Sequence, residues 1–198
     1  FFPKVTQSIS HMRRLDNVDE LTAIYCDAIS HFEEKLGMCF LQLHENFGIK
    51  ELKKLKVFVE NFPKVIPLAV EVRGLEWFSD KVTWNGFCDF LEEHKTTNII
   101  VDTAGRRDML HMRLTTPTAF IRFVGCNVDE IDRKRIDDWV DRIEKWRKEG
   151  LQHLYFFVHQ NVEVSSPLFS AYLTEKLNER LNLHLHVPQM AGEQGKLF

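Results

Sequence analysis

The sequence lacks several patterns that would assign a function at once. Its four cysteines, Cys26, Cys39, Cys88 and Cys126, form no C-x-x-C pair and have no zinc-finger spacing. No G-x-G-x-x-G or G-x-x-x-x-G-K-[ST] loop follows a predicted strand, which weakens a nucleotide-binding interpretation. No apolar run reaches the roughly 18 residues of a membrane span. We therefore expect free, mostly buried thiols, a cytoplasmic location and no membrane partner.

Charge of one sign is also not in large excess. The net charge of −3 gives no overall attraction to nucleic acids or acidic membranes, although local basic patches remain open. The 198 residues, of which 44% are hydrophobic, are enough for a packed core. We therefore expect one domain spanning residues 1–198, with an interior rich in the 16 Phe and four Trp side chains. No protein partner can be inferred.

What the sequence does contain is a regular alternation of strands and helices. Amphipathic helical patterns begin near Asn17, Lys50, Trp84, Asp129 and Ser166. This alternation indicates an α/β fold with a parallel sheet. The predicted strands are Phe1–Thr6, Cys39–His44, Leu68–Arg73, Asn98–Asp102, Phe120–Val124 and Leu154–His159.

The number of strands favours a TIM-type (β/α) parallel barrel. Such a barrel typically needs about 250 residues, so this chain is short by close to two strand–helix units. The chain also opens on Phe1-Phe2-Pro3 without an initiating Met. We therefore expect a barrel whose N-terminal two strand–helix units are missing from the sequence. An open doubly wound sheet is the alternative.

Two local signals lie outside the strands. Asn17, followed by Glu20 three residues later, resembles a capping box for the first helix, and Gly37 is suited to end that helix. The segment from Thr103 to Pro117 has only a weak helical pattern. We predict a loop-rich crossover there, of the kind that often carries function.

Polar side chains gather late in the predicted strands, where parallel barrels carry their chemistry. Alternation along a strand groups Glu71 with Arg73 and Gln42 with His44. We predict Glu71 and Asp102 as catalytic acid–base residues, Arg73 and Arg122 as an electrostatic clamp, and Trp77 as a stacking wall. The alternative is a structural ion-pair network. The predicted substrate-binding residues are Lys4, His11, Gln42, Arg73, Trp77, Arg122 and His159.

The loops after the strands are rich in basic residues, which predicts an electropositive mouth for a phosphate- or carboxylate-bearing ligand. A small anionic or nucleic-acid-derived substrate fits, and a non-catalytic nucleic-acid-binding protein is an alternative. A metal-dependent hydrolase or isomerase, using His44, Glu71, Asp102 and His159, is a third. These four residues form no H-x-H or H-E-x-x-H motif, so we predict no metal and no cofactor. The basic loop residues are His11, Arg13, Arg14, Arg106, Arg107, His111 and Arg113.

Several segments resemble the YecE-like family, a TIM-barrel family known as a domain of unknown function. They are KVTQSISHMRRL, LGMCFLQLHENF, AVEVRGLEWF, NIIVDTAGRR and FIRFVG, followed by a charged helix with Trp139 and Trp146. The resemblance spans essentially the whole chain and implies the barrel fold without an established reaction. It also implies that the family's first two strands are absent here. The positions that match recurrent family motifs are Lys4, His11, Gln42, Glu71, Arg73, Trp77, Asp102 and Arg122.

The sequence departs from the family pattern at three places. Gly74 replaces the histidine of the family's A-V-E-F-R-H motif, and Val124 replaces the histidine of R-L-H-G. The usual F-N-N after the last strand reads Val158-His159-Gln160-Asn161. A mechanism that depends on those family side chains is not expected to operate in this chain.

Overall fold

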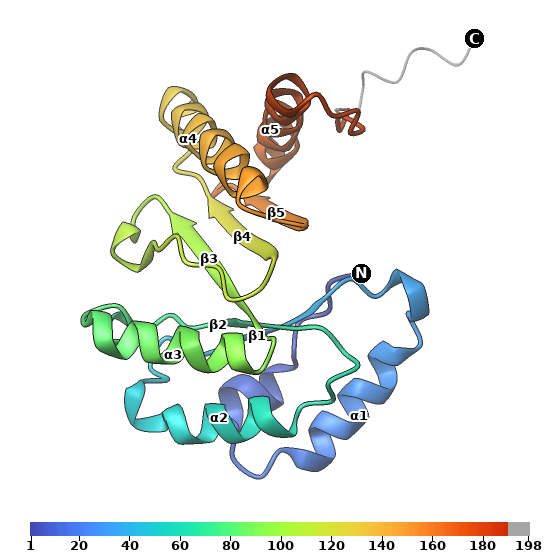
Figure 1. The fold of residues 1–198 in the computed structure, drawn as a ribbon, viewed down its shortest axis with the longest axis vertical. Coiled ribbons are helices and arrows are strands. Elements are labelled where there is room, and N and C mark those ends of the chain that lie inside the picture. The colour runs from blue at the N-terminus through green and yellow to red at the C-terminus, as the bar shows by residue number, and fades with distance from the viewer. Residues whose placement is uncertain (190–198) are drawn as a thin grey trace. The chain divides into compact units, whose positions relative to one another are not determined.

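A computed structural model describes residues 1–189, in which five β-strands alternate with α-helices except between β3 and β4, where no α-helix intervenes (Figure 1). The strands are β1 (Cys39–Gln42), β2 (Leu68–Glu71), β3 (Thr97–Thr103), β4 (Thr118–Val124) and β5 (His153–His159). The helices are α1 (Asp19–Ser30), α2 (Leu52–Asn61), α3 (Lys81–Glu93), α4 (Asp129–Lys148) and α5 (Ser166–Leu181). The predicted α/β alternation is thereby confirmed.

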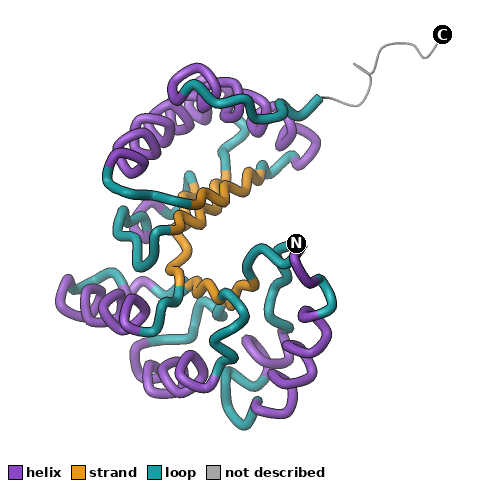
Figure 2. Tube along the Cα trace, turned by 45° about the vertical axis from the view of Figure 1, so that its right-hand side comes forward, coloured by secondary structure: helices purple, strands orange, loops and turns teal. Residues whose placement is uncertain are grey.

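The strands, drawn in orange in Figure 2, form a parallel sheet. Their order is β1-β2-β3-β4-β5, so each strand neighbours the next one along the chain. Between β1 and β2 the register runs from Cys39 opposite Leu68 to Gln42 opposite Glu71. Between β2 and β3, Val70 lies opposite Asn98. These two registers decide which side chains share a face.

The prediction of a strand at Phe1–Thr6 is wrong. Lys4 forms only an isolated parallel bridge with Phe40, through hydrogen bonds from Val5 N to Phe40 O and from Phe40 N to Pro3 O. Pro3 has no N–H to extend the ladder, which accounts for its brevity. The bridge nevertheless places Lys4 beside β1.

The predicted cap of the first helix is also wrong. Helix α1 begins at Asp19 with Val18 as its N-cap, and no side chain caps it. Asn17 instead adopts a left-handed conformation with φ of 50°, which asparagine tolerates better than most residues. The helix ends at Ser30, and a short 3-10 turn, Glu33–Lys35, covers part of the stretch expected to continue to Gly37.

The chain divides into two compact units. Unit 1 comprises Phe1–Ile100 and His111–Phe120, and unit 2 comprises Val101–Leu110 together with the described residues from Ile121 onward. The crossover between β3 and β4 is irregular apart from a 3-10 turn at Arg107–Met109, as predicted. It contributes residues to both units.

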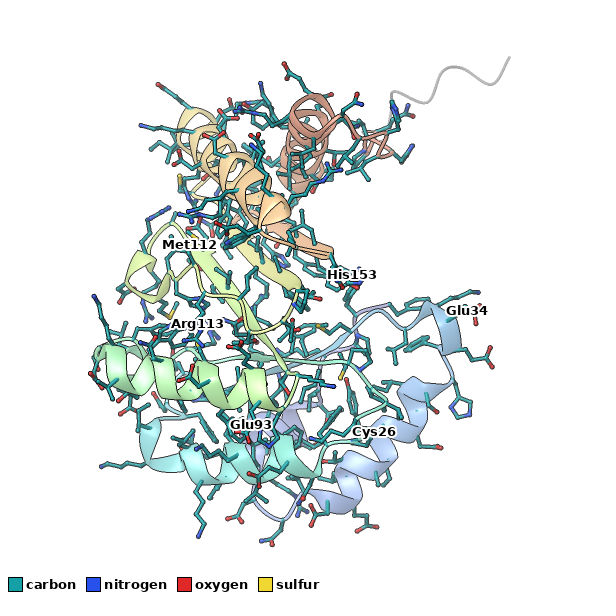
Figure 3. All side chains as sticks on the ribbon, viewed as in Figure 1. Cys26, Glu34, Glu93, Met112, Arg113 and His153 are labelled. Carbon is teal, nitrogen blue, oxygen red and sulfur yellow. The ribbon has the colours of Figure 1, made fainter. Side chains whose placement is uncertain are left out.

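The core of unit 1 is formed where helices α1, α2 and α3 bury their apolar stripes against β1 and β2. Leu41, Leu55, Trp77 and Leu91 contribute to it and are fully buried. Cys26 on α1 also belongs to this core (Figure 3). This packing fixes the two strands whose ends carry the site.

In unit 2, α4 packs on α5, and Trp139 of α4 contacts Trp146 and Phe156 with ring centroids 6.0 Å apart in both cases. No disulfide links the cysteines, which are free as predicted; Cys26, Cys39 and Cys88 are buried. Within residues 1–189, no helix combines the length and hydropathy that crossing a membrane requires.

Candidate functional site

The ends of β1 and β2 bring two predicted site residues side by side. Gln42 and Glu71 lie opposite each other in register, and Gln42 Nε2 donates a hydrogen bond of 2.8 Å to Glu71 Oε1. Lys4, positioned by its bridge to Phe40, donates from Nζ to Gln42 Oε1 at 2.6 Å. Polar contacts therefore connect an exposed ammonium group, through a buried amide, to a buried carboxylate.

The Glu71 carboxylate is almost completely buried, with 1% of its side chain exposed. The Nε atom of Arg73 lies 3.6 Å from Glu71 Oε1, while 42% of the Arg73 side chain is exposed. A buried carboxylate is costly unless a cation and hydrogen bonds stabilise it, and Arg73 and Gln42 supply both. The cation also extends toward solvent, where a ligand can reach it.

Two histidines complete this group. The rings of His11 and His44 meet edge to face, with centroids 5.6 Å apart. Burial is the main cause that lowers the pKa of the His11 imidazole below its ordinary value. Positive charge on Lys4, His44 and Arg73 acts in the same direction. His11 therefore lies in a region of positive potential.

We call this group the strand-end cluster. Its members come from the N-terminal segment, from the ends of β1 and β2 and from the residues that follow these strands, all within unit 1. The structure thus assembles five predicted site residues, Glu71 among them, together with His44, which the metal alternative also named. The cluster consists of Lys4, His11, Gln42, His44, Glu71 and Arg73.

Trp77 does not form the predicted stacking wall. Its side chain is fully buried, its Nε1 donates to Phe47 O at 2.9 Å, and its ring lies 5.0 Å from that of Phe87. Burial of the apolar indole in the core stabilises the fold, and its one polar atom has a hydrogen-bond partner there.

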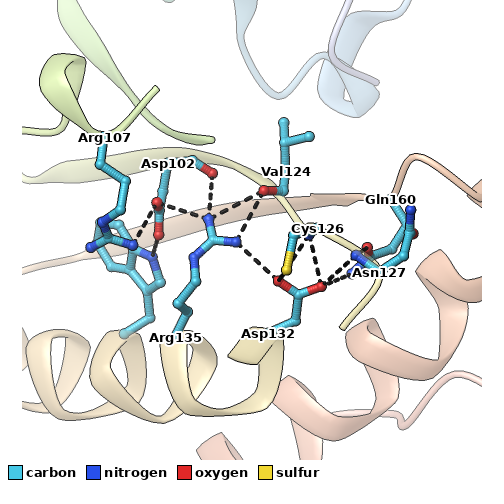
Figure 4. A network of polar contacts seen from close by, with 9 residues as sticks. Asp102, Arg107, Val124, Cys126, Asn127, Asp132, Arg135 and Gln160 are labelled. Carbon is cyan, nitrogen blue, oxygen red and sulfur yellow. Dashed lines mark hydrogen bonds and ion pairs between the residues drawn. The ribbon is translucent and has the colours of Figure 1, made fainter. Parts of the chain in front are cut away.

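Asp102 belongs to a separate network in unit 2 (Figure 4). Its carboxylate is 1% exposed and contacts two guanidinium groups, with Arg135 Nη2 at 2.8 Å and Arg107 Nη1 at 3.2 Å from Oδ1. Trp139 Nε1 donates to Oδ2 at 2.8 Å. These contacts stabilise the buried carboxylate of Asp102 and are sufficient to explain its burial by a structural role. Its predicted role as a base stays a prediction.

Sequence reasoning missed the other acid of this network. Asp132 is fully buried and accepts from Arg135 Nη1 at 3.0 Å and from the backbone N–H groups of Cys126 and Asn127. A Cβ atom on Gly125 would come within 2.5 Å of Asp132, so the close approach requires glycine. The available signal was spacing, because positions 132 and 135 lie on the same helix face as Ile136 and Trp139.

The remaining two predicted site residues also lie in unit 2. Arg122 is half-buried on β4. His159 closes β5, where its Nδ1 lies 3.5 Å from Oε1 of Glu163 and 41% of its side chain is exposed. Their predicted roles in substrate binding stay predictions.

The predicted electropositive mouth needs correction, because acidic side chains accompany most of its arginines. Arg14 pairs with Glu51, Arg106 with Asp108 at 3.3 Å, and Arg107 with Asp102. Arg113, labelled in Figure 3, contacts both Asp89 and Glu92. These pairs offset the basic charge on which the nucleic-acid-binding alternative depended.

The metal alternative also has no supporting geometry. Across the part of the chain that the structure describes, no three or more His, Cys, Asp and Glu side chains are grouped so that they could hold a metal ion. The set of His44, Glu71, Asp102 and His159 is therefore not found as a ligand group.

Comparison with known proteins places the chain in a family. The chain is 25% identical to the UPF0759 protein YecE of Escherichia coli K12 and, at the same identity, to that of strain O157:H7; each alignment covers 98% of this chain and 77% of the relative. Two crystal structures of a DUF72 family protein from Enterococcus faecalis V583 give TM-scores of 0.70 and 0.68. The two solved chains are 19% and 17% identical to this chain. The alignments cover 93% and 96% of this chain, and 78% and 77% of the respective solved chains. The model of the family described as "Protein of unknown function DUF72" matches residues 1–192, and the chain therefore belongs to this family.

Proposed function

We propose that this protein is an enzyme that binds an anionic substrate at the strand-end cluster and uses Glu71 as its acid–base group. The observation that carries the proposal is the position of Glu71. Its carboxylate is buried at the end of β2, in contact with Gln42 and Arg73 and connected through Gln42 to Lys4. A carboxylate at the end of a parallel strand, in contact with a partly exposed cation, is in a position where it can act on a bound substrate.

The anionic character of the substrate follows from the cations of the cluster. Lys4 is exposed, and the Arg73 guanidinium is partly exposed and can bind a phosphate or carboxylate with two hydrogen bonds. The positive potential at His11 supports the same assignment. A phosphate- or carboxylate-bearing small molecule, including one derived from nucleic acid, therefore fits best.

Glu71 then supplies the proton transfer. A carboxylate that is shielded from water and placed below the cations can remove a proton from a bound substrate or donate one to it. Arg73 would stabilise negative charge that develops during the reaction. This chemistry corresponds to a hydrolase or to an isomerase or lyase.

We also propose that the parallel sheet forms part of a TIM-type (β/α) barrel. The strand order supports this proposal, because every strand neighbours the next in sequence. A doubly wound sheet would instead reverse its strand order at a switch point. In a barrel, the carboxyl ends of the strands are where active sites lie, and the strand-end cluster occupies such ends.

Arg73→Gln is expected to weaken the binding of inorganic phosphate about tenfold. The variant removes a charge-assisted hydrogen bond, which is worth about 1.5 kcal/mol. Lys4→Gln should have a similar effect, and isothermal titration calorimetry measures both. Arg14→Gln is the matched control, because Arg14 is held by Glu51 outside the cluster, and its phosphate affinity should equal that of the wild type. Equal losses in all three variants, or a wild-type protein that binds neither phosphate nor sulfate, would refute the assignment.

Glu71→Gln is expected to abolish turnover while the protein stays folded. Glutamine keeps the shape of the side chain but cannot take up a proton, so the catalytic step is lost. The measurement is a screen of the wild type against phosphate esters and hydroxycarboxylic acids, followed by the assay of the variant on any substrate found. Retained activity in the folded variant rules out the proposed role of Glu71.

A further inference from the structure

The hydroxyl group of Ser10 contacts both a backbone carbonyl and the ring of the neighbouring His11. Ser10 is fully buried in the short helical segment Ser8–Met12, where its hydroxyl donates to Thr6 O at 3.0 Å and lies 2.8 Å from His11 Nδ1. A hydroxyl group has a single proton to donate. Since that proton is used at Thr6, His11 Nδ1 carries the hydrogen and donates to Ser10 Oγ. Neutral His11 therefore has its lone pair on Nε2.

His44 has the opposite arrangement. The backbone N–H of Asn46 donates to His44 Nδ1 at 3.1 Å, so this nitrogen provides the lone pair. The hydrogen of neutral His44 is therefore on Nε2. Two adjacent imidazoles, whose ring centroids lie 5.6 Å apart, thus have complementary free nitrogens. Nε2 of His11 accepts a proton, and Nε2 of His44 donates a hydrogen bond.

We infer that Nε2 of His11 is a proton acceptor of the strand-end cluster, that Nε2–H of His44 is the donor beside it, and that Ser10 is the positioning residue that fixes the tautomer of His11. This inference rests on the proposed function and narrows its substrate to an anion that carries a hydroxyl group. A hydroxyl can donate to His11 and accept from His44, whereas Lys4 and Arg73 bind the anionic group.

The proton transfer has a simple balance. The Nε2 lone pair of His11 forms a bond to the hydroxyl proton, the O–H bond breaks, and its electron pair stays on the oxygen. The imidazole becomes an imidazolium ion with a proton on each nitrogen, and the Nδ1–H bond to Ser10 is retained. Glu71 and His11 then give the site two groups that can exchange protons with a substrate.

The surroundings of His11 keep it in the form that this role requires. Burial lowers the pKa of the imidazole, and the positive charges of Lys4 and Arg73 lower it further. On the Nδ1 side of the His11 ring, Ser10 Oγ contacts the ring and Thr6 O contacts Ser10 Oγ. Both oxygen atoms are uncharged. His11 is therefore neutral, and able to accept a proton, in the neutral pH range.

Nitrogen-15 NMR of the histidine-labelled wild-type protein tests the tautomers directly. We expect His11 to be protonated at Nδ1 and His44 at Nε2 at a pH where both rings are neutral. Ser10→Ala should shift His11 toward the other tautomer, while Ser8→Ala, in the same segment, should leave it unchanged. A wild-type His11 with its proton on Nε2 overturns the inference, whether or not Ser10→Ala folds.

Acylation by diethyl pyrocarbonate separates this inference from the proposed function. His11 should be modified at Nε2 in the wild type, with the exposed His31 as the reactive reference. If His31 is modified and His11 is not, the Nε2 lone pair of His11 is not accessible, and the inference is overturned. Inorganic phosphate should protect His11 in the wild type, and Arg73→Gln should need an about tenfold higher phosphate concentration for the same protection. A reactive His11 that phosphate never protects would refute the anion site instead and leave the tautomer assignment standing.

Discussion

Asp102→Ala is expected to lower the free energy of unfolding by about 3–5 kcal/mol, because it leaves a buried cation without one of its two carboxylates. Arg135 is 8% exposed and contacts both Asp102 and Asp132. The variant also removes the acceptor of the buried Trp139 N–H. Urea denaturation, monitored by tryptophan fluorescence and circular dichroism, gives the change.

The matched control for Asp102 is Asp108, which follows the same strand. Asp108 is 47% exposed and pairs with Arg106 at 3.3 Å, so Asp108→Ala should cost less than about 1 kcal/mol. If Asp102 is structural, the folded Asp102→Ala protein should also bind phosphate with wild-type affinity. A small loss of stability combined with a large loss of phosphate binding would instead place Asp102 in the binding site.

Acidification from pH 7 to pH 4 is expected to remove about 3 kcal/mol of stability through His111 alone. This ring packs against Trp84 and Phe78, at centroid distances of 4.3 and 6.1 Å. Burial lowers the pKa of His111 from 6.5 to about 4. The neutral ring is thus stabilised in the folded protein.

The direction of this effect follows from proton uptake. The unfolded chain binds a proton at His111 near pH 6.5, but the folded protein binds it only near pH 4. Falling pH therefore favours unfolding across this window and adds nothing below it. His111→Phe keeps an aromatic ring but cannot titrate, so its stability relative to the wild type should rise by about 3 kcal/mol between pH 7 and pH 4.

Urea denaturation at several pH values measures this difference. The control is His31→Phe, at an exposed position, which should follow the pH dependence of the wild type. A His111→Phe curve parallel to the wild-type curve would show that the ring is not held neutral in the folded state.

Much of the fold could be predicted from the sequence because its signals are local. Short apolar segments and amphipathic helical patterns identified β1 to β5 and the five helices of residues 1–189, with boundaries shifted by a few residues. The link between Gln42, Glu71 and Arg73 followed from alternation and strand ends. The cap at Asn17 failed because the chain turns there in left-handed conformations, as at Leu15, which a propensity argument does not detect.

The position of Asp102 could not be predicted, because it depends on register between strands. Alternation gives the faces within one strand, but a shift of one residue between strands exchanges them. Val70 lies opposite Asn98, and Asp102 shares the face of β3 that carries Asn98. Trp77 illustrates a similar limit, since its burial depends on packing between distant segments.

The network around Asp102 has a consequence for the effect of dissolved ions. Three consecutive ion pairs join four side chains of alternating charge, and these charges sum to zero. The four residues are, in order, Arg107, Asp102, Arg135 and Asp132. Only the Arg107 end of this series, 49% exposed, is open to solvent. Moderate ionic strength screens surface pairs such as Arg133 with Asp129 but acts weakly on buried charges. Added salt should therefore weaken the ion pairs on the exposed face of α4, while the buried ion pairs on its inner face keep their strength.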